Sequence, residues 1–181
     1  MTYIPLLEKA SGKAGEILGA VEKDLGMIPN VFKGLANSPE SLEAYLVFMK
    51  SMATSKITAQ LKESLAITVA STNTCGYCAS AHTALGQGTG LDEEELKLNL
   101  EAKSKDPKNQ VALQFAKKIV ENKGRVLDSD LEALEEAGFG SQELVEIMAI
   151  ISINIFTNYF NHVAGTEIDF PLVKLNSVAV S

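Results

Sequence analysis

Two cysteines and a histidine lie close together in the stretch that runs from Glu63 to His82. Cys75 and Cys78 form a Cys-x-x-Cys pair, and the 181-residue chain has no other cysteine. At this spacing two thiols in the first turn of a helix can close a disulfide with little backbone movement. His82 follows Cys78 by four residues, so on a helix its imidazole shares a face with the second thiol. The spacing predicts thiol chemistry with a base close at hand.

A carboxylate precedes this group in an otherwise apolar run. Glu63 stands before Leu65, Ile67 and Val69, and the pattern indicates a buried helix. A buried carboxylate needs a polar partner. The nearest candidate is His82, or a water beside it. The alternative is that Glu63 is an exposed helix carboxylate with no role in the chemistry.

The composition indicates an ordinary globular protein. Apolar residues make up 46% of the chain and charged residues 22%, so residues 1–181 are expected to form one domain. The net charge is −7, and Lys and Arg form no cluster. This balance argues against binding to nucleic acid or to an anionic membrane surface.

The sequence also favours a cytoplasmic location. The first residues lack the basic and apolar regions of a secretory signal. The longest charge-free stretch, 147–166, contains Asn154, Asn158, Asn161 and His162, which would be costly in lipid. In a reducing cytosol a lone Cys-x-x-Cys pair is more typical of redox or metal chemistry than of a static cross-link.

Apolar spacing and helix-start signals predict an all-α chain. Helices are expected over about 40–52, from Thr58 through Glu63, from the cysteine pair onward, after Asp106, over 128–137 and over about 144–163. Asn73 and Thr74 are expected to cap the helix that carries the cysteines. A thiol at a helix N-terminus feels the positive end of the helix dipole, which lowers its pKa from about 8.5 toward roughly 3.5–7.5.

The chain contains a faint internal similarity. Placing Leu61 over Leu144 also aligns Glu63 with Glu146 and sets the two cysteines against Asn158 and Asn161. This pattern suggests two related helical halves, of which only the first carries the thiols. A shared amphipathic period could produce much of the match.

The order of Glu63, Cys75-x-x-Cys78 and His82 resembles the core of the alkylhydroperoxidase D-like group of the carboxymuconolactone decarboxylase superfamily, at about residues 40–90. The resemblance extends to most of the chain. The turn at 26–30, the helix stop at 35–39 and the asparagines of the last helix are similar to the peroxidase-related branch.

The resemblance implies an all-helical bundle that assembles into trimers or hexamers and works as a thiol-dependent alkyl hydroperoxide reductase. Cys78 would be the peroxidatic cysteine and Cys75 the resolving one. Glu63 and His82 would relay the proton. An external dithiol, which in the family can be a lipoyl-bearing protein, would regenerate the pair without any bound cofactor or metal. The position of His82, one turn after Cys78, agrees with this order of the thiols.

One residue departs from the family pattern, and several alternatives stay open. The best-studied family type has a histidine just before the second cysteine, where this chain has Tyr77, a poor base near neutral pH. A redox-sensing helical oligomer, a general disulfide reductase and a zinc site built on the same side chains are the alternatives. A lactone decarboxylase is disfavoured, because those superfamily members generally lack the cysteine pair. The methionines at positions 27, 49, 52 and 148 are expected in the core or at subunit contacts.

Overall fold

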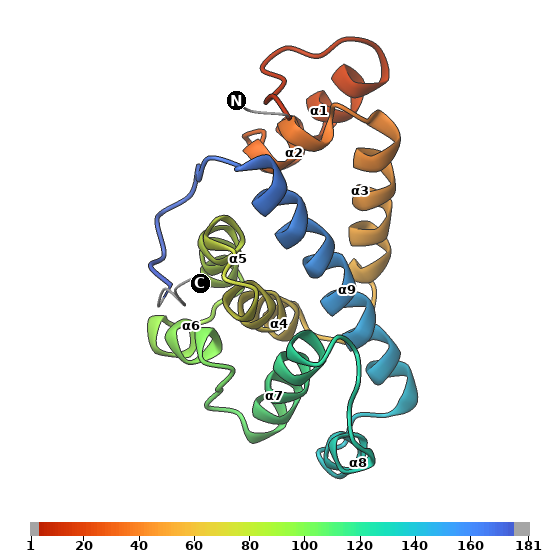
Figure 1. The fold of residues 1–181 in the computed structure, drawn as a ribbon, viewed down its shortest axis with the longest axis vertical. Helices are drawn as coiled ribbons and strands as arrows, with labels where there is room; N and C mark the ends of the chain where they lie inside the picture. Colours follow the sequence, from red (N-terminus) through yellow and green to blue (C-terminus); the bar gives the residue numbers. More distant parts are fainter. Residues whose placement is uncertain (1–3, 176–181) are drawn as a thin grey trace.

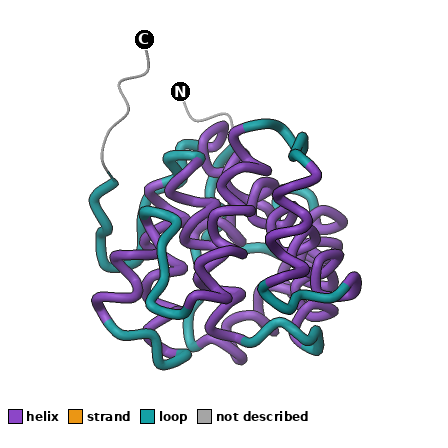
Figure 2. The backbone as a smooth tube through the Cα atoms, turned by 90° about the horizontal axis from the view of Figure 1, so that it is seen from below, coloured by secondary structure: helices purple, strands orange, loops and turns teal. Residues whose placement is uncertain are grey.

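The computed structural model describes residues 4–175, and each regular element within that range is an α-helix (Figures 1 and 2). The all-α prediction is therefore confirmed. The helices are α1 (Gly12–Leu25), α2 (Asn30–Leu35), α3 (Pro39–Ala53), α4 (Ala59–Thr72), α5 (Gly76–Gly88), α6 (Glu93–Leu100), α7 (Pro107–Glu121), α8 (Asp128–Glu136) and α9 (Ser141–Ala164).

Local capping chemistry explains where several helices begin. The Ser38 hydroxyl accepts a hydrogen bond from the Ser41 amide at 3.3 Å, and Pro39 occupies the first position of α3. In the same way the Thr58 hydroxyl accepts from the Leu61 amide at 3.2 Å and starts α4. Both starts agree with the sequence prediction because cap and helix are neighbours along the chain.

The last helix, α9, runs diagonally across the molecule and packs against α3, α4, α5 and α7 (Figure 1). Its length and composition alone would suit a membrane span. It nevertheless buries Asn154, Asn158 and Asn161 among the other helices. A central core helix of a globular protein has this same signature.

The buried side chains form two clusters, and α4 contributes to both. One cluster joins α4 to α7, α8 and α9 around Leu65, Leu113 and Ile151. The other joins α1, α2, α3 and α5 around Phe32 and Leu42, and it includes both cysteines. The redox pair is therefore fixed in packed core rather than in a loose loop.

The two segments of the suggested repeat differ in shape. Residues 141–164 form one uninterrupted helix, whereas the first segment breaks between α4 and α5 at Thr74, whose φ is 56°. The aligned positions 78 and 161 nevertheless meet, because Asn161 contacts Cys78. Descent of the two halves from one unit stays a prediction.

The chain after α9 folds back along the helix that carries the cysteines (Figure 1). The Val173 amide donates to the Ser80 hydroxyl at 3.0 Å, and the Asn30 amide donates to the Asp169 carboxylate at 2.7 Å. These bonds tie the segment to α5 and to the start of α2. They hold both helices in place around the cysteine pair.

Candidate active site

Cys75 and Cys78 form a disulfide at the N-terminus of α5, with their Cα atoms 5.4 Å apart. Cys75 is itself the N-cap, since its sulfur accepts a hydrogen bond from the Cys78 amide at 3.3 Å. The expected capping role of Asn73 and Thr74 is therefore wrong. Asn73 instead ends α4 as its C-cap.

A tight turn between α4 and α5 sets the position of the pair. Thr74 has a left-handed backbone conformation, which is uncommon for a β-branched residue. The reversal lets the Cys75 amide donate to the Ala70 carbonyl at 2.8 Å. Cys75 and Cys78 are 2% and 3% exposed, so access to the sulfurs depends on the cavity beside them.

Glu63 and His82 form a direct pair between α4 and α5. The Nδ1 atom of His82 lies 2.8 Å from a carboxylate oxygen of Glu63, and both side chains are about one-fifth exposed. The reading of Glu63 as an isolated exposed carboxylate is therefore wrong. A carboxylate at this distance accepts the Nδ1 proton, which leaves Nε2 of the neutral ring free to accept another proton.

A cavity of about 530 Å³ opens beside this pair, and its wall is mainly apolar. Glu63, His82 and Cys78 line it, whereas Cys75 does not. The cavity thus brings together three of the four predicted site residues and is lined by only one of the two cysteines. Aromatic and thioether groups form much of the remaining wall, namely Phe32, Tyr45, Phe170, Met27, Met49 and Met52.

The methionines were only partly predicted. Met148 packs against the core, as expected. Met27, Met49 and Met52 line the cavity, and their expected place at subunit contacts stays a prediction. Their flexible thioethers suit a wall that adapts to an apolar ligand. Sequence spacing did not reveal this position because α1, α3 and α5 meet here only in the tertiary fold.

Residues 39–118 match the family model described as the carboxymuconolactone decarboxylase family, and this segment contains Glu63, both cysteines and His82. Over this segment, which is less than half of the chain, the protein is similar to the AhpD/carboxymuconolactone decarboxylase superfamily. No curated protein matches the sequence.

Solved structures of similar fold extend over nearly the whole chain. An uncharacterized peroxidase-related protein from Silicibacter sp. TM1040 is 23% identical, with a TM-score of 0.81 and coverage of 91% of this chain and 89% of the other. An uncharacterized peroxidase-related protein with an alkylhydroperoxidase AhpD core, from Ralstonia eutropha JMP134, is 23% identical, with a TM-score of 0.82 and coverage of 92% and 90%. The debrominase Bmp8 is 22% identical, with a TM-score of 0.80 and coverage of 93% of each chain.

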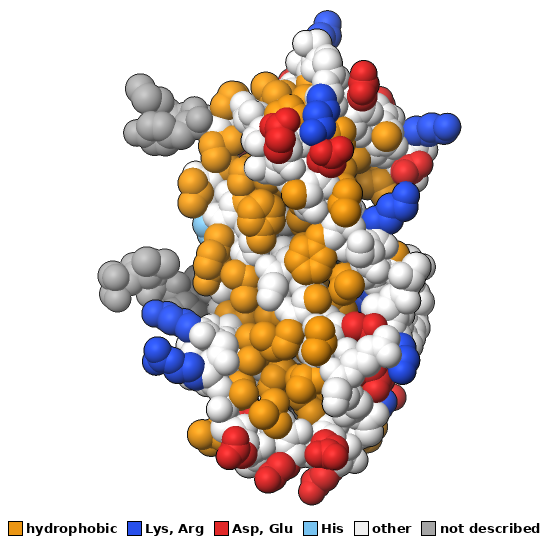
Figure 3. All heavy atoms as spheres, turned by 90° about the vertical axis from the view of Figure 1, so that its right-hand side faces the viewer, with side chains coloured by type: hydrophobic (Ala, Val, Ile, Leu, Met, Phe, Trp, Pro, Cys, Tyr) orange, Lys and Arg blue, Asp and Glu red, His pale blue; other side chains and the backbone are white. Residues whose placement is uncertain are grey.

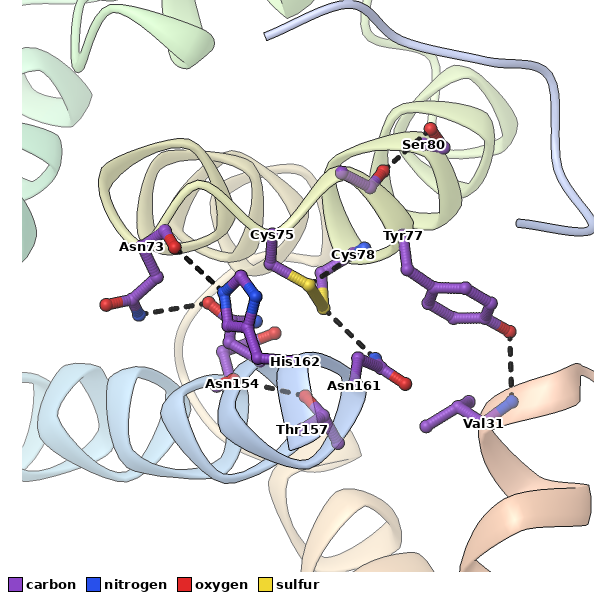
Figure 4. Close-up of a disulfide and its surroundings, with 12 residues drawn as sticks. Val31, Asn73, Cys75, Tyr77, Cys78, Ser80, Asn154, Thr157, Asn161 and His162 are labelled. Carbon is purple, nitrogen blue, oxygen red and sulfur yellow. Dashed lines mark hydrogen bonds between the residues drawn. A yellow bond between two sulfur atoms is a disulfide. The ribbon is translucent and has the colours of Figure 1, made fainter. Parts of the chain in front are cut away.

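Tyr77 connects α5 to α2. The best-studied superfamily type has a histidine at this position. Its hydroxyl oxygen accepts a hydrogen bond from the Val31 amide at 3.1 Å (Figure 4), and its ring packs edge-on against Phe170. Burial raises the pKa of the Tyr77 hydroxyl far above neutral pH. Tyr77 therefore stays uncharged and satisfies one of the free amides at the start of α2.

Sequence reasoning missed one polar contact to the redox pair. The side-chain amide nitrogen of Asn161, on α9, donates to the sulfur of Cys78 at 3.2 Å (Figure 4). The asparagines of the last helix entered the sequence analysis as residues costly in lipid, as partners of the cysteines in the internal similarity and as a likeness to the superfamily, but not as contacts of the redox pair. The one available signal was their burial pattern, since three amides on a core helix need partners.

His162 also lies near the pair. It is exposed, and its Nε2 atom lies 2.9 Å from the Asn73 carbonyl. Among residues 4–175 no three His, Cys, Asp or Glu side chains are grouped so as to hold a metal ion.

Proposed function

We propose that the protein is a thiol-dependent reductase of organic hydroperoxides in which Cys78 attacks the peroxide. The observation that carries the proposal is the cavity, which joins the Cys78 sulfur to the Glu63–His82 pair and leaves Cys75 outside. A nucleophile must face its substrate, and a resolving thiol needs only to reach the nucleophile. The match of residues 39–118 to the carboxymuconolactone decarboxylase family model and the fold shared with peroxidase-related proteins support the same reading.

The cycle begins with the reduced pair. His82 takes the proton of the Cys78 thiol through Nε2, while Glu63 holds its Nδ1 proton. The thiolate attacks the terminal oxygen of the hydroperoxide, the O–O bond breaks, and the leaving alkoxide receives the proton from His82. The products are an alcohol and a sulfenic acid on Cys78.

The second half of the cycle restores the thiols. The thiol of Cys75 condenses with the sulfenic acid of Cys78, which releases water and forms the disulfide at the start of α5. An external dithiol then reduces this disulfide by exchange and is itself oxidised. A lipoyl-bearing protein is the proposed reductant, and a reducing compartment such as the cytoplasm is the proposed location.

The test of the function is peroxide consumption by pre-reduced protein with dihydrolipoamide in excess. We expect multiple turnovers, faster with cumene hydroperoxide than with hydrogen peroxide, because the apolar wall binds an apolar substituent. A redox sensor would give a single oxidation per chain. If metal-free protein with confirmed reduced thiols shows no turnover with any dithiol, the peroxidase proposal fails.

The cavity itself supplies a second prediction about substrate size. Ala81 lies on α5 between Cys78 and His82 and lines the cavity, whereas Ala84 lies outside it. Ala81→Leu should raise KM for cumene hydroperoxide by about tenfold and leave hydrogen peroxide nearly unaffected, because added methyl groups occupy the space of the aryl ring. Ala84→Leu is the matched control, and steady-state kinetics with both peroxides make the comparison.

A reductive dehalogenase is the second candidate. The debrominase Bmp8 has been solved, as a cysteine-to-alanine variant, in complex with 2,3,4-tribromopyrrole, and the apolar cavity beside Cys78 would accommodate a halogenated ring of that kind. In such a reaction the Cys78 thiolate would take the bromine, the ring carbon would gain a proton, and Cys75 would displace bromide to form the disulfide. Bromide release from 2,3,4-tribromopyrrole with dihydrolipoamide, in place of peroxide turnover, would favour this reading.

Association of copies of this chain forms a further part of the proposal. Helix α3 buries only Leu42. Five of the exposed positions of α9, namely 145, 152, 156, 159 and 163, have the spacing of a helix-pairing seam. Figure 3 shows apolar side chains along the middle of this face and charged ones toward its ends. We call it the α3–α9 face; its large exposed apolar residues are Val47, Phe48, Met49, Val145, Phe156, Tyr159 and Val163.

A second copy is the proposed occupant of the α3–α9 face. Its seven large apolar residues are between 38% and 74% exposed, and a second copy that packs on them would remove this apolar surface from water. We expect light scattering to give a trimer or hexamer and the double variant Phe48→Glu, Phe156→Glu to shift it toward monomer. Leu127→Glu, at an exposed apolar residue outside this face, is the control. A monomeric parent protein would overturn the proposal.

A further inference from the structure

Each sulfur of the redox pair has its own hydrogen-bond donor. The sulfur of Cys75 receives the backbone amide of Cys78, at 3.3 Å, from within the same helix turn. The sulfur of Cys78 receives the side-chain amide of Asn161, at 3.2 Å, from α9 (Figure 4). An N–H donor stabilises a thiolate more than a thiol, so Asn161 favours the reactive form of the sulfur that faces the cavity.

The other end of the same amide is unused. Asn161 is only 5% exposed, and its Oδ1 atom has no hydrogen-bond partner among the described residues. Its side chain lines the cavity together with Cys78. A buried carbonyl oxygen without a donor is costly and calls for a specific explanation. A ligand that brings an O–H group to the Cys78 sulfur would satisfy it.

The neighbouring asparagines of α9 make other hydrogen bonds, and Asn158 also leaves one polar atom, Nδ2, without a partner among the described residues. Asn154 donates to the Ile150 carbonyl at 2.8 Å, and the Oδ1 atom of Asn158 accepts from Asn73 at 3.0 Å. Of the three, Asn161 is the one that touches a sulfur. The contact with the sulfur is therefore specific to Asn161 and is not shared by the other two asparagines of this helix.

We propose that Asn161 forms the subsite for the –OOH group of the substrate, with its N–H held on the Cys78 sulfur and its Oδ1 accepting the peroxide O–H. This inference rests on the proposed hydroperoxidase function. The terminal oxygen of a hydroperoxide carries the hydrogen, and it is also the atom that the thiolate attacks. One amide would thus hold both reacting atoms together. The substrate class is a hydroperoxide with a free O–H, rather than a dialkyl peroxide.

The two roles of Asn161 can be measured separately in a Cys75→Ser background, where Cys78 is the single thiol. The pH dependence of alkylation by iodoacetamide gives the pKa of Cys78 without any peroxide. The rate of sulfenic acid formation with cumene hydroperoxide, at a pH where the thiol is fully ionised, gives the reactivity of each thiolate. The variants are Asn161→Leu, which removes both amide functions, and the isosteric Asn161→Asp, which removes the donor.

We expect Asn161→Leu to raise the pKa of Cys78 by about one unit, because it loses the N–H that stabilises the thiolate. Asn161→Asp should raise the pKa further, because it loses the same N–H and also adds a negative charge beside the sulfur. Asn161→Leu should also lower the rate per thiolate by about a hundredfold, since the O–H of the peroxide loses its acceptor. Asn154→Leu is the matched control for the alkylation measurement. It removes a buried amide from the same helix without touching the sulfur, so the pKa of Cys78 should not move.

The possible failures are distinguishable. If the parent reacts with peroxide but both variants keep its alkylation pKa and its rate per thiolate within about twofold, Asn161 only packs and the inference is overturned. If the parent is alkylated normally but forms no sulfenic acid, the peroxidase proposal and the proposed –OOH subsite both fail. Should Asn161→Leu fail to fold, Asn161→Ala, which also removes both amide functions without adding a charge, decides the thiolate contact.

Discussion

Cys78→Ser is expected to abolish peroxide turnover, and Cys75→Ser is expected to stop the cycle after one sulfenic acid per chain. The reason is the asymmetry of the pair, in which only Cys78 lines the cavity. A serine hydroxyl is a very weak nucleophile at neutral pH, so the loss in rate should be about a thousandfold or more. In Cys75→Ser the nucleophile is intact, but no thiol is left to form the disulfide.

The measurement combines peroxide consumption with trapping of the sulfenic acid by dimedone and intact-mass analysis. The parent protein should consume many equivalents with dihydrolipoamide and show no trapped adduct. Cys75→Ser should consume one equivalent and carry one adduct, located at residue 78. The assignment of the thiols would be reversed if Cys78→Ser, rather than Cys75→Ser, accumulated the adduct.

The parts of the site that the sequence predicted are those set by local rules. The shared face of Cys78 and His82 follows from helical spacing alone. The partner of Glu63 follows from the cost of burying a carboxylate, and the structure places His82 there at 2.8 Å. In both cases the constraint acts within one helix or between two consecutive helices, so the order of residues carries the information.

The cap of α5 shows where local rules compete. Asn73 and Thr74 are good capping residues, but α4 and α5 share one short turn, and Asn73 is used to end α4. The sulfur of Cys75 therefore caps the N-terminus of α5. Propensity ranks residue types at a helix start, but it does not say which residue is the start when two helix ends are adjacent.

The contacts that could not be predicted join distant parts of the chain. Asn161 reaches Cys78 across 83 residues, and that contact depends on how α9 crosses α5. The cavity wall likewise combines Met27 from the turn after α1 with Met49 from α3. Helical periodicity shows that these side chains are apolar and regularly spaced, but it does not show which helices face each other across a cavity.

The Glu63–His82 pair should behave as one unit in kinetics. His82→Asn removes the group that accepts and returns the proton, and we expect sulfenic acid formation to slow by about a hundred- to a thousandfold. Glu63→Gln retains an oxygen that can accept the Nδ1 proton but removes the negative charge, so its cost should be about tenfold. The rates are measured in the Cys75→Ser background with cumene hydroperoxide in excess.

The double variant distinguishes a relay from two independent contributions. Because Glu63 contacts the ring of His82 and acts through it, removing Glu63 should cost almost nothing further once His82 is gone. Costs that multiply in the double variant would mean that Glu63 acts on the substrate or on the sulfur by itself. Glu146→Gln is the matched control, because Glu146 aligns with Glu63 in the internal similarity but lies outside the cavity and binds the Lys56 amide. Its rate should equal that of the parent, since a helix carboxylate without the histidine has no proton to position.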